Sequence, residues 1–463
     1  MSYLKQYTIH AMAVLLLAFA MLSSSCNKLI EIPSHPDDKL SRDRVFSDSL
    51  DVMSALVGLY TNMHTSGYGG YIFSSDLTIY TGMSSDELMF AYPGPSDFFS
   101  NDLTPGNGEV NTLWSSAYVG LYQVNAFLEG VTNNRKISED LQRQVRGEAL
   151  VTRAFYYFQL VNLYGAVPMI TGTDFQSNAK KPRASVDSIY ALMISDLTTA
   201  SSLLKEAYPS AGHLRPNLQA ARALLARIYL YRGQWQQAAD LSSQVIGSNM
   251  YQLIDPTGVF WDDSKEAIWQ VPYTTDGSQT ADANYLTPTY VGGTPSYVLT
   301  DWMVNAFEPG DLRQTGWTAS TLVNGVTYNY SAKYKNSYSG TPIEDYMLLR
   351  LGEQYLIRAE ALAHLDLLDS ARGDINTIRA RAGLGITTAV TKDEVLLAIE
   401  HERQVELFCE LGHRWYDLNR TGRAGDVLSA EKTTGWQPTD ALYPVPLEQM
   451  QSNPFLTQNP GYQ

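Results

Sequence analysis

Cysteine is scarce in this sequence: the 463 residues include only two, Cys26 and Cys409. An exported enzyme that relied on disulfides for stability would carry more, so a disulfide framework is excluded. The only disulfide open to the chain is a Cys26–Cys409 bridge. Cys409 lies in an apolar helical stretch, and we interpret it as a small buried hydrophobic side chain.

Positive charge is also in short supply, because 33 Lys and Arg residues face 48 Asp and Glu residues, for a net charge of -15. Nucleic acid requires clustered basic side chains, so a nucleic-acid partner is excluded. The charge gives no reason to expect direct binding to anionic lipid. A composition that is 44% hydrophobic and 11% aromatic indicates a large folded protein with a substantial core.

Motifs for catalysis and cofactor binding are missing. The sequence contains no His-Glu-x-x-His pair, no Gly-x-Ser-x-Gly elbow and no phosphate loop ending in Gly-Lys-Ser/Thr, and its seven histidines are scattered. We therefore expect neither enzymatic activity nor a cofactor or metal. A glycoside hydrolase needs only two carboxylates at a set separation, so it stays open as an alternative.

The N-terminal apolar run, from Ala11 to Leu22, is too short to cross a bilayer, which needs roughly 20 residues. It follows Lys5 and precedes three serines and Cys26, the layout of a secretory signal. Small residues directly before a cysteine are what lipoprotein signal peptidase requires, although Ser23 stands where leucine is usual. We predict a signal peptide at residues 1–25 and lipidation of Cys26.

Apolar residues recur at helical spacing in separated blocks. The spacing predicts helices over residues 46–63, 114–131, 137–164, 186–204, 217–246 and 347–382. The last two blocks break at Arg232-Gly233 and near Leu367, and alanines mark close helix crossings. These features loosely match tetratricopeptide-like helix pairs, which must stack to bury their apolar faces. We predict a mainly α fold whose scaffold spans about 46–63, 114–246 and 347–420 within one domain, 26–463.

Two long polar and aromatic stretches, residues 65–113 and 251–341, interrupt these blocks and show weak strand-like alternation. Loops of this length in a compact domain are usually functional. We predict that the two insertions form a ligand face, the alternative being that they merely cap the scaffold.

Several motifs together resemble the SusD/RagB family over nearly the whole mature chain. They comprise Gly147-Glu148-Ala149 and Arg153-Ala154-Phe155-Tyr156-Tyr157, Tyr164-Gly165-Ala166-Val167-Pro168, Pro182-Arg183-Ala184-Ser185-Val186, Leu356-Ile357-Arg358-Ala359-Glu360-Ala361, Asp374-Ile375-Asn376-Thr377-Ile378-Arg379-Ala380-Arg381-Ala382-Gly383, Gly412-His413-Arg414-Trp415-Tyr416-Asp417-Leu418, Tyr443-Pro444-Val445-Pro446 and Gln458-Asn459-Pro460-Gly461-Tyr462. The charged motif residues Glu402, Arg403, Glu406, Arg414 and Asp417 alternate in sign, as paired charges at a packed helix junction would, so we interpret them as structural.

The resemblance implies a non-catalytic lipoprotein, anchored to the outer membrane through Cys26 and exposed at the cell surface. Its partners would be an oligosaccharide or polysaccharide and a SusC-like TonB-dependent transporter that takes the glycan up. A peptide- or protein-binding role for the helical scaffold stays open as an alternative.

Sugar rings present apolar C–H faces to aromatic side chains, while short polar groups bind the hydroxyls. The first insertion offers Phe90, Tyr92, Phe98 and Phe99, and the second offers Tyr285, Tyr290, Tyr297 and Trp317. From these stretches we predict a glycan site made by Asp76, Tyr92, Phe98, Asn101, Tyr290 and Trp317. Because residues 65–113 contain no tryptophan, where family members carry a tryptophan arc, we expect a glycan other than starch.

Overall fold

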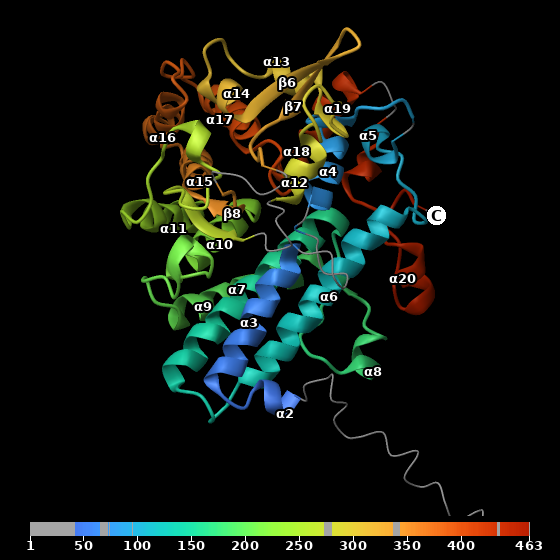
Figure 1. The fold of residues 1–463 in the computed structure, drawn as a ribbon, viewed down its shortest axis with the longest axis vertical. Helices are drawn as coiled ribbons and strands as arrows, with labels where there is room; N and C mark the ends of the chain where they lie inside the picture. The colour runs from blue at the N-terminus through green and yellow to red at the C-terminus, as the bar shows by residue number, and fades with distance from the viewer. Residues whose placement is uncertain are drawn as a thin grey trace, which may run out of the picture.

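A computed structural model describes residues 42–64, 73, 75–94, 96–272, 280–336, 343–432 and 436–462 (Figure 1). The N-terminal half is built from long helices: α2 (Arg42–Val45), α3 (Ser49–His64), α6 (Gly108–Val131), α7 (Glu139–Tyr164) and α9 (Val186–Leu203). Asn107, Ser138 and Ser185 begin α6, α7 and α9 by accepting a backbone N–H from the first turn. These capping side chains explain where the helices start.

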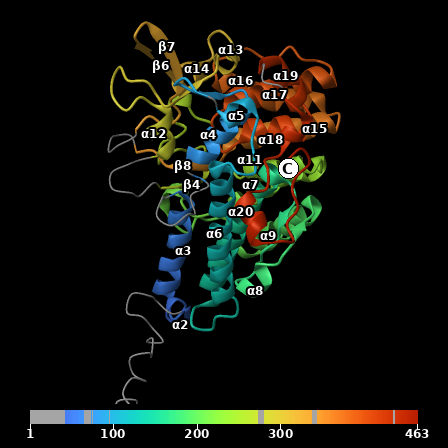
Figure 2. The same ribbon diagram turned by 90° about the vertical axis from the view of Figure 1, so that its right-hand side faces the viewer.

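The C-terminal half continues the helical scaffold with α10 (Leu218–Tyr231), α11 (Trp235–Gly247), α15 (Leu351–His364), α16 (Leu368–Arg381), α17 (Lys392–Leu407), α18 (His413–Arg420) and α19 (Ala424–Glu431). Gly233 and Asp366, in the two predicted breaks, have left-handed φ values of 66° and 61°. The helices pack in sequence order, α6 on α7, α7 on α9, α9 on α10, α10 on α11, α11 on α15, and α15 on α16 and α17 (Figures 1 and 2). The mainly α, tetratricopeptide-like scaffold is confirmed.

The last predicted helix begins later than expected, because residues 346–350 form a strand. This strand, β8 (Tyr346–Arg350), pairs antiparallel with β4 (Ala267–Val271), and both strands are buried throughout. A short apolar run such as Tyr-Met-Leu-Leu is compatible with a buried strand or a buried helix. Pairing with β4, about 80 residues away along the chain, decides between them.

The two insertions contain short strands, as predicted, and also short helices, which the strand-like alternation did not predict. The first holds α4 (Ser75–Ser84), β1 (Leu88–Phe90) and α5 (Asp97–Ser100). The second holds η2 (Pro256–Gly258), β4, α12 (Ala281–Leu286), β5 (Tyr297–Leu299), α13 (Asp301–Asn305), α14 (Leu312–Trp317), β6 (Thr318–Val323) and β7 (Val326–Ser331). β6 and β7 form a hairpin whose turn, Asn324-Gly325, has positive φ at both residues.

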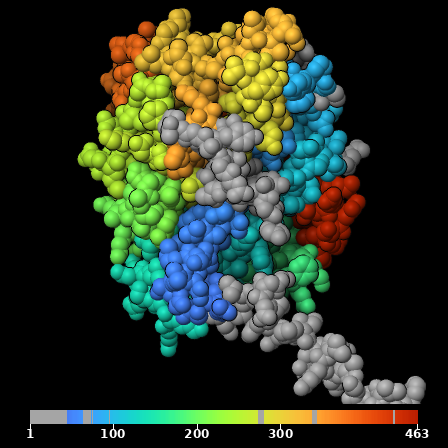
Figure 3. Space-filling view, in the orientation of Figure 1, coloured from blue at the N-terminus to red at the C-terminus, as the bar shows by residue number. Residues whose placement is uncertain are grey.

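The two insertions are joined directly by a second antiparallel pair, β1 with β5, in which Leu88 faces Leu299 and Phe90 faces Tyr297. Thr300 extends the junction, because its backbone N–H bonds the Glu87 carbonyl at 3.0 Å. In the space-filling view the blue atoms of the first insertion lie beside the yellow atoms of the second (Figure 3). Residues far apart in sequence therefore share one face of the molecule.

The remaining described elements connect and cover the scaffold: β2 (Val167–Pro168), β3 (Arg183–Ala184), α8 (Phe175–Asn178), η1 (Ala211–His213), η3 (Pro438–Ala441) and α20 (Leu447–Ser452). The C-terminal segment packs on α7, where the Asn459 side chain donates to the carbonyls of Tyr164 and Tyr443 at 3.0 and 2.8 Å. Among the described residues, no helix is both long and apolar enough to span a membrane.

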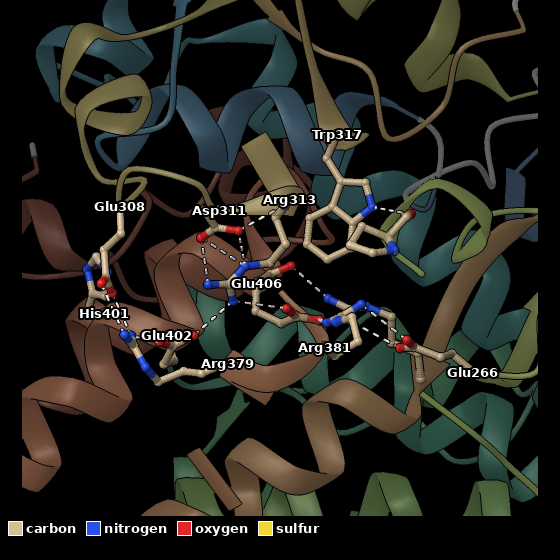
Figure 4. Close-up of polar contacts among 12 residues, drawn as sticks. Glu266, Glu308, Asp311, Arg313, Trp317, Arg379, Arg381, His401, Glu402 and Glu406 are labelled. Atoms are coloured by element: carbon tan, nitrogen blue, oxygen red, sulfur yellow. Dashed lines mark hydrogen bonds and ion pairs between the residues drawn. The ribbon is translucent and has the colours of Figure 1, made fainter. Parts of the chain in front are cut away.

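A buried network of ion pairs fixes the second insertion to the scaffold (Figure 4). Glu406 of α17 contacts Arg313 of α14 at 3.2 Å, Arg350 of β8 at 2.5 Å and also Arg381 of α16. These cations hold the pKa of Glu406 well below its usual value despite its burial. Arg313 also pairs with Glu402 at 2.9 Å.

The other predicted charges are paired as well. Arg403 bonds Asp417 at 2.6 Å, and Arg414 bonds Asp86 at 2.7 Å, which ties the first insertion to α18. The charged motif residues are therefore paired, as their alternation in sign indicated. Cys409 is buried and free, whereas Cys26 and the predicted signal peptide lie outside the described residues.

Candidate functional site

A hollow of about 250 Å³ opens where α4, β1, α5 and β5 meet, and we call it the aromatic hollow. Both insertions contribute to it. Tyr297 comes from the second insertion, and the other lining residues come from the first insertion, which includes the start of α6. The lining residues are Tyr80, Met83, Phe90, Ser96, Asp97, Phe98, Asn107, Glu109 and Tyr297. The strand pairing of β1 with β5 therefore creates this site.

Aromatic rings form one wall of the aromatic hollow. Phe90 packs against Tyr297 and Tyr92, with ring centroids 5.4 Å apart in both pairs. Phe90 is 37% exposed and Tyr92 is 49% exposed, so part of each ring faces solvent. Partly exposed rings held in place by neighbours offer apolar platforms at low conformational cost.

Short polar groups also line the aromatic hollow. Asn107 caps α6 through its Oδ1 and donates from Nδ2 to Asp97 at 3.1 Å, while Ser96 caps α5. These hydrogen bonds hold the side chains of Asn107 and Ser96 in fixed positions in the lining of the hollow. Amide, hydroxyl and carboxylate groups in fixed positions are suited to hydrogen bonds with ligand hydroxyls.

Asp76, at the first turn of α4, lies close to the aromatic hollow without lining it. Burial raises the pKa of its carboxyl, and the negative charge of Glu109 raises it further. Burial also raises the pKa values of Tyr80 and Tyr297, and the Asp76 charge is the next cause in both cases. These mutual effects place Asp76, Glu109 and the two tyrosines in one electrostatic environment.

A second, larger hollow of about 710 Å³ lies within the second insertion, and we call it the polar hollow. Its walls carry Tyr290, Tyr330 and Lys335 together with a series of hydroxyl side chains from Thr287, Thr289, Thr315, Thr318, Ser320 and Thr321. Tyr290 is 72% exposed. Because β5 packs beside β7, the two hollows belong to the same region of the molecule.

Four of the six predicted glycan-binding residues line one of the two hollows or lie beside it. Phe98 lines the aromatic hollow and Tyr290 lines the polar hollow. Tyr92 packs on Phe90 beside the aromatic hollow, and the half-buried Asp76 lies near it. The structure does not bring all six residues into one site. It divides the surface residues between two neighbouring hollows.

Trp317 does not present a ring face to solvent, so our expectation for it needs correction. Its side chain is 1% exposed, and its Nε1 donates to the Pro256 carbonyl at 2.6 Å (Figure 4). Lys333 and Arg381 lie 4.6 and 5.1 Å from its ring centroid. Trp317 therefore packs over the buried ion network and has a structural role.

Phe98 and Asn101 are also buried, at 4% and 8% exposure, and for Asn101 the expectation needs the same correction. Phe98 stacks on Tyr80 with centroids 4.5 Å apart and forms the floor of the aromatic hollow. Asn101 donates to the Ser84 carbonyl at 3.0 Å and accepts from Lys432 at 3.0 Å. The Asn101 amide is therefore already paired and has a structural role, whereas Phe98 lines the aromatic hollow from the core side.

Tyr80, Asn107 and Glu109 line the aromatic hollow but were not among the predicted residues. Asn107 caps α6 and Glu109 is an acidic residue in its first turn, so their roles at the helix start are a sufficient reason for their presence in the sequence. Tyr80 lies in a helix whose residues are mostly buried. The signal that could have identified Phe90 and Tyr297 is their place in short strands that can pair across the two insertions.

Comparisons with known proteins agree with this architecture. A family model described as "Starch-binding associating with outer membrane" matches residues 35–230, and the SusD family model matches residues 311–462. The SusD-like protein P38 of Formosa agariphila is 24% identical over 525 residues, covering 99% of this chain and 100% of the relative.

Solved structures show the same fold. A SusD superfamily protein from Bacteroides vulgatus has a TM-score of 0.80 and 25% identity, covering 90% of this chain and 99% of its own. A laminarin-binding SusD-like protein has a TM-score of 0.74 and 24% identity, covering 90% of this chain and 100% of its own. From its matches to both family models and its shared fold, the chain belongs to the SusD/RagB family.

Proposed function

We propose that this protein is a cell-surface lipoprotein that binds an oligosaccharide at the aromatic hollow without cleaving it. It then passes the glycan to a SusC-like TonB-dependent transporter in the outer membrane. The observation that carries the binding role is the aromatic hollow itself, which Phe90 and Tyr297 line together with Asn107 and two carboxylates. Tyr92 packs on Phe90 beside it.

The contact area between a sugar ring and an aromatic side chain is large enough to support binding. Burying about 100 Å² of a sugar face against a ring contributes roughly 2.5 kcal/mol at 25 cal/mol per Å². Two platforms and a few hydrogen bonds therefore support modest affinity, which suits a protein that must release its ligand. The family model's description as starch-binding and the laminarin-binding neighbour both support a carbohydrate as the ligand.

Calorimetry of the soluble form, without residues 1–26, against a panel of polysaccharides tests this proposal. We expect at least one glycan to bind, with no release of reducing ends during prolonged incubation. Phe90→Ala and Tyr92→Ala should each weaken binding by roughly 2 kcal/mol, or about thirty-fold, while the melting temperature changes little.

The matched control is Phe175→Ala, which removes an aromatic ring that is 81% exposed on α8, outside both hollows. Its affinity should equal that of the unmodified protein. Unchanged affinity in both Phe90→Ala and Tyr92→Ala would show that the site lies elsewhere. Release of reducing ends would contradict the non-catalytic role.

A further inference from the structure

Among the described residues that line the aromatic hollow, the charged side chains are all carboxylates. Asp97 and Glu109 line it, and Asp76 lies beside it, whereas its described lining contains no Lys, Arg or His. In a hollow lined by rings, water screens charges less well than at an open surface. The sign of this local charge therefore decides which ligands can enter.

The sequence around the hollow shows the same imbalance. From Thr65 to Leu113 there is no Lys, Arg or His, but there are six acidic residues, Asp76, Asp86, Glu87, Asp97, Asp102 and Glu109. The parts of the two insertions that lie outside the described residues contain a single charged residue, Asp276. The parts of the insertions outside the described residues therefore contain no basic residue that could line the aromatic hollow.

Lys432 bonds the backbone of Met83, which lines the hollow, and its ammonium group is already fully paired. It is 3% exposed, and its Nζ donates to the carbonyls of Met83 and Ser84 and to Asn101 Oδ1 at 2.7, 2.8 and 3.0 Å. Arg414, the next cation on this side, pairs with Asp86. Neither offers a donor to a ligand.

The basic residues of the second insertion are likewise committed or distant. Arg313 and Lys333 are buried in the ion network, where Lys333 pairs with Glu410 at 2.5 Å. Lys335 lines the polar hollow, and Lys265 lies beside β4 rather than in the lining of either hollow. A negatively charged ligand in the aromatic hollow would thus meet carboxylates with no compensating cation.

We infer that the aromatic hollow selects glycans that carry neither carboxylate nor sulfate groups, an inference that rests on the proposed function. Uncharged sugar hydroxyls can donate hydrogen bonds to Asp97 and Glu109, so these carboxylates favour a neutral glycan. A uronate or a sulfate at the same place would be repelled by like charges and would lose its own hydration.

Matched pairs of glycans test the inference: laminarin, amylopectin and galactan, each before and after oxidation of its C6 hydroxyls to carboxylates, with alginate and carrageenan as natural polyanions. We expect the neutral member of a binding pair to bind at least about tenfold more tightly than its oxidised form at low salt, a difference of about 1.4 kcal/mol. Raising the salt concentration should reduce this ratio, because salt screens the repulsion.

The double variant Asp76→Asn with Glu109→Gln should reduce the same ratio, whatever it does to the affinity for the neutral glycan. The control Asp140→Asn removes an exposed carboxylate at the start of α7 and should leave the ratio unchanged. Binding of the polyanions alone, or equal affinity for both members of a pair, would overturn the inference and leave the proposed function standing. Binding of no glycan at all would overturn both.

Discussion

Single aromatic side chains of this protein differ in what covers them, and this difference assigns their roles. Trp317 and Phe98 are almost completely buried, whereas large parts of Tyr92 and Tyr290 are exposed to solvent. All four come from insertions with similar composition. The neighbours of each ring, rather than its residue type, separate a ligand platform from a core residue.

The first prediction concerns Trp317. Removing a buried tryptophan typically costs about 3–5 kcal/mol of stability, so Trp317→Ala should lower the melting temperature strongly. Its Nε1 hydrogen bond to Pro256 is lost at the same time. Thermal unfolding checks this, with Tyr290→Ala as the exposed control that should melt like the unmodified protein. A Trp317→Ala protein of normal stability but weakened glycan binding would restore our sequence-based expectation.

The second prediction concerns Asp282, a buried carboxyl near Thr78, Tyr346, Asp76 and Glu410. Burial raises its pKa from the ordinary 3.8 to about 7, with further increases from the charges of Asp76 and Glu410, against lowering by hydrogen bonds from Thr78 and Tyr346. Between these two values the folded protein holds a proton that the unfolded chain has released. The free energy of unfolding contributed by this group therefore falls as the pH rises through that window.

Asp282→Asn removes this titration. We expect its melting temperature to fall less between about pH 5 and about pH 8 than that of the unmodified protein, because the raised pKa near 7 then no longer contributes. Differential scanning calorimetry at the two pH values measures the change. Equal declines in both proteins would show that Asp282 does not titrate in this range.

Pairs of helices and strands hold the scaffold and the hollows together at close range. The crossing of α6 and α7 is an example, because Gly120 lies against the ring of Tyr156, which is 1% exposed. A Cβ at position 120 would lie 2.2 Å from Tyr156 Cζ. Such close crossings require small residues, as the pattern of the sequence indicates elsewhere in the scaffold.

The third prediction is therefore that Gly120→Ala destabilises the protein by about 1–3 kcal/mol, because the Tyr156 ring must shift in a packed core. The control is Gly58→Ala in α3, where no atom lies within 4 Å of the added Cβ. Alanine there should leave stability unchanged or raise it, by up to about 1 kcal/mol. Denaturant unfolding measures the free energy of unfolding of both variants. If Gly120→Ala were as stable as Gly58→Ala, α6 and α7 would be less closely packed than the structure indicates.

The whole molecule combines a helical scaffold, which carries the insertions on one side, with a chain that the sequence predicts to be anchored at Cys26. The structure describes the protein from Arg42 onward, so the anchor stays a prediction. The hollows and the anchor lie in different parts of the chain. This separation is compatible with a ligand face that is free while the N-terminus is held at a membrane.

The fourth prediction is that Cys26 is the lipidated first residue of the mature protein, because small residues and an apolar run precede it. Mass spectrometry of protein extracted from membranes should find a diacylated N-terminal cysteine. Cys26→Ser should leave the protein unprocessed or release it from the membrane fraction. An unmodified cysteine, or cleavage at another position, would contradict the anchor.

The fifth prediction is a stable complex with a SusC-like transporter. Gentle detergent extraction of membranes should co-purify this protein with a partner of transporter size. The Phe90→Ala variant should still co-purify, because the aromatic hollow is assigned to glycan and not to the transporter. Recovery of the protein alone would count against the partnership.

Local chemistry in the sequence was enough to predict the helix pairs, the breaks near Gly233 and Leu367, and that the charged motif residues are paired, although not which residue pairs with which. These features depend on near neighbours along the chain: apolar spacing, capping side chains and glycine at positive φ. The sequence motifs were also enough to identify the resemblance to the SusD/RagB family. Such signals survive without knowledge of the fold because each is complete within one or two helices.

Only the tertiary structure decided that residues 346–350 form a strand, that β1 pairs with β5, and that Trp317 is buried while Tyr92 is exposed. The physical reason is the same in each case. Burial and strand pairing depend on contacts between segments distant in sequence, and an aromatic residue in an insertion has the same local pattern whether it meets the core or the solvent.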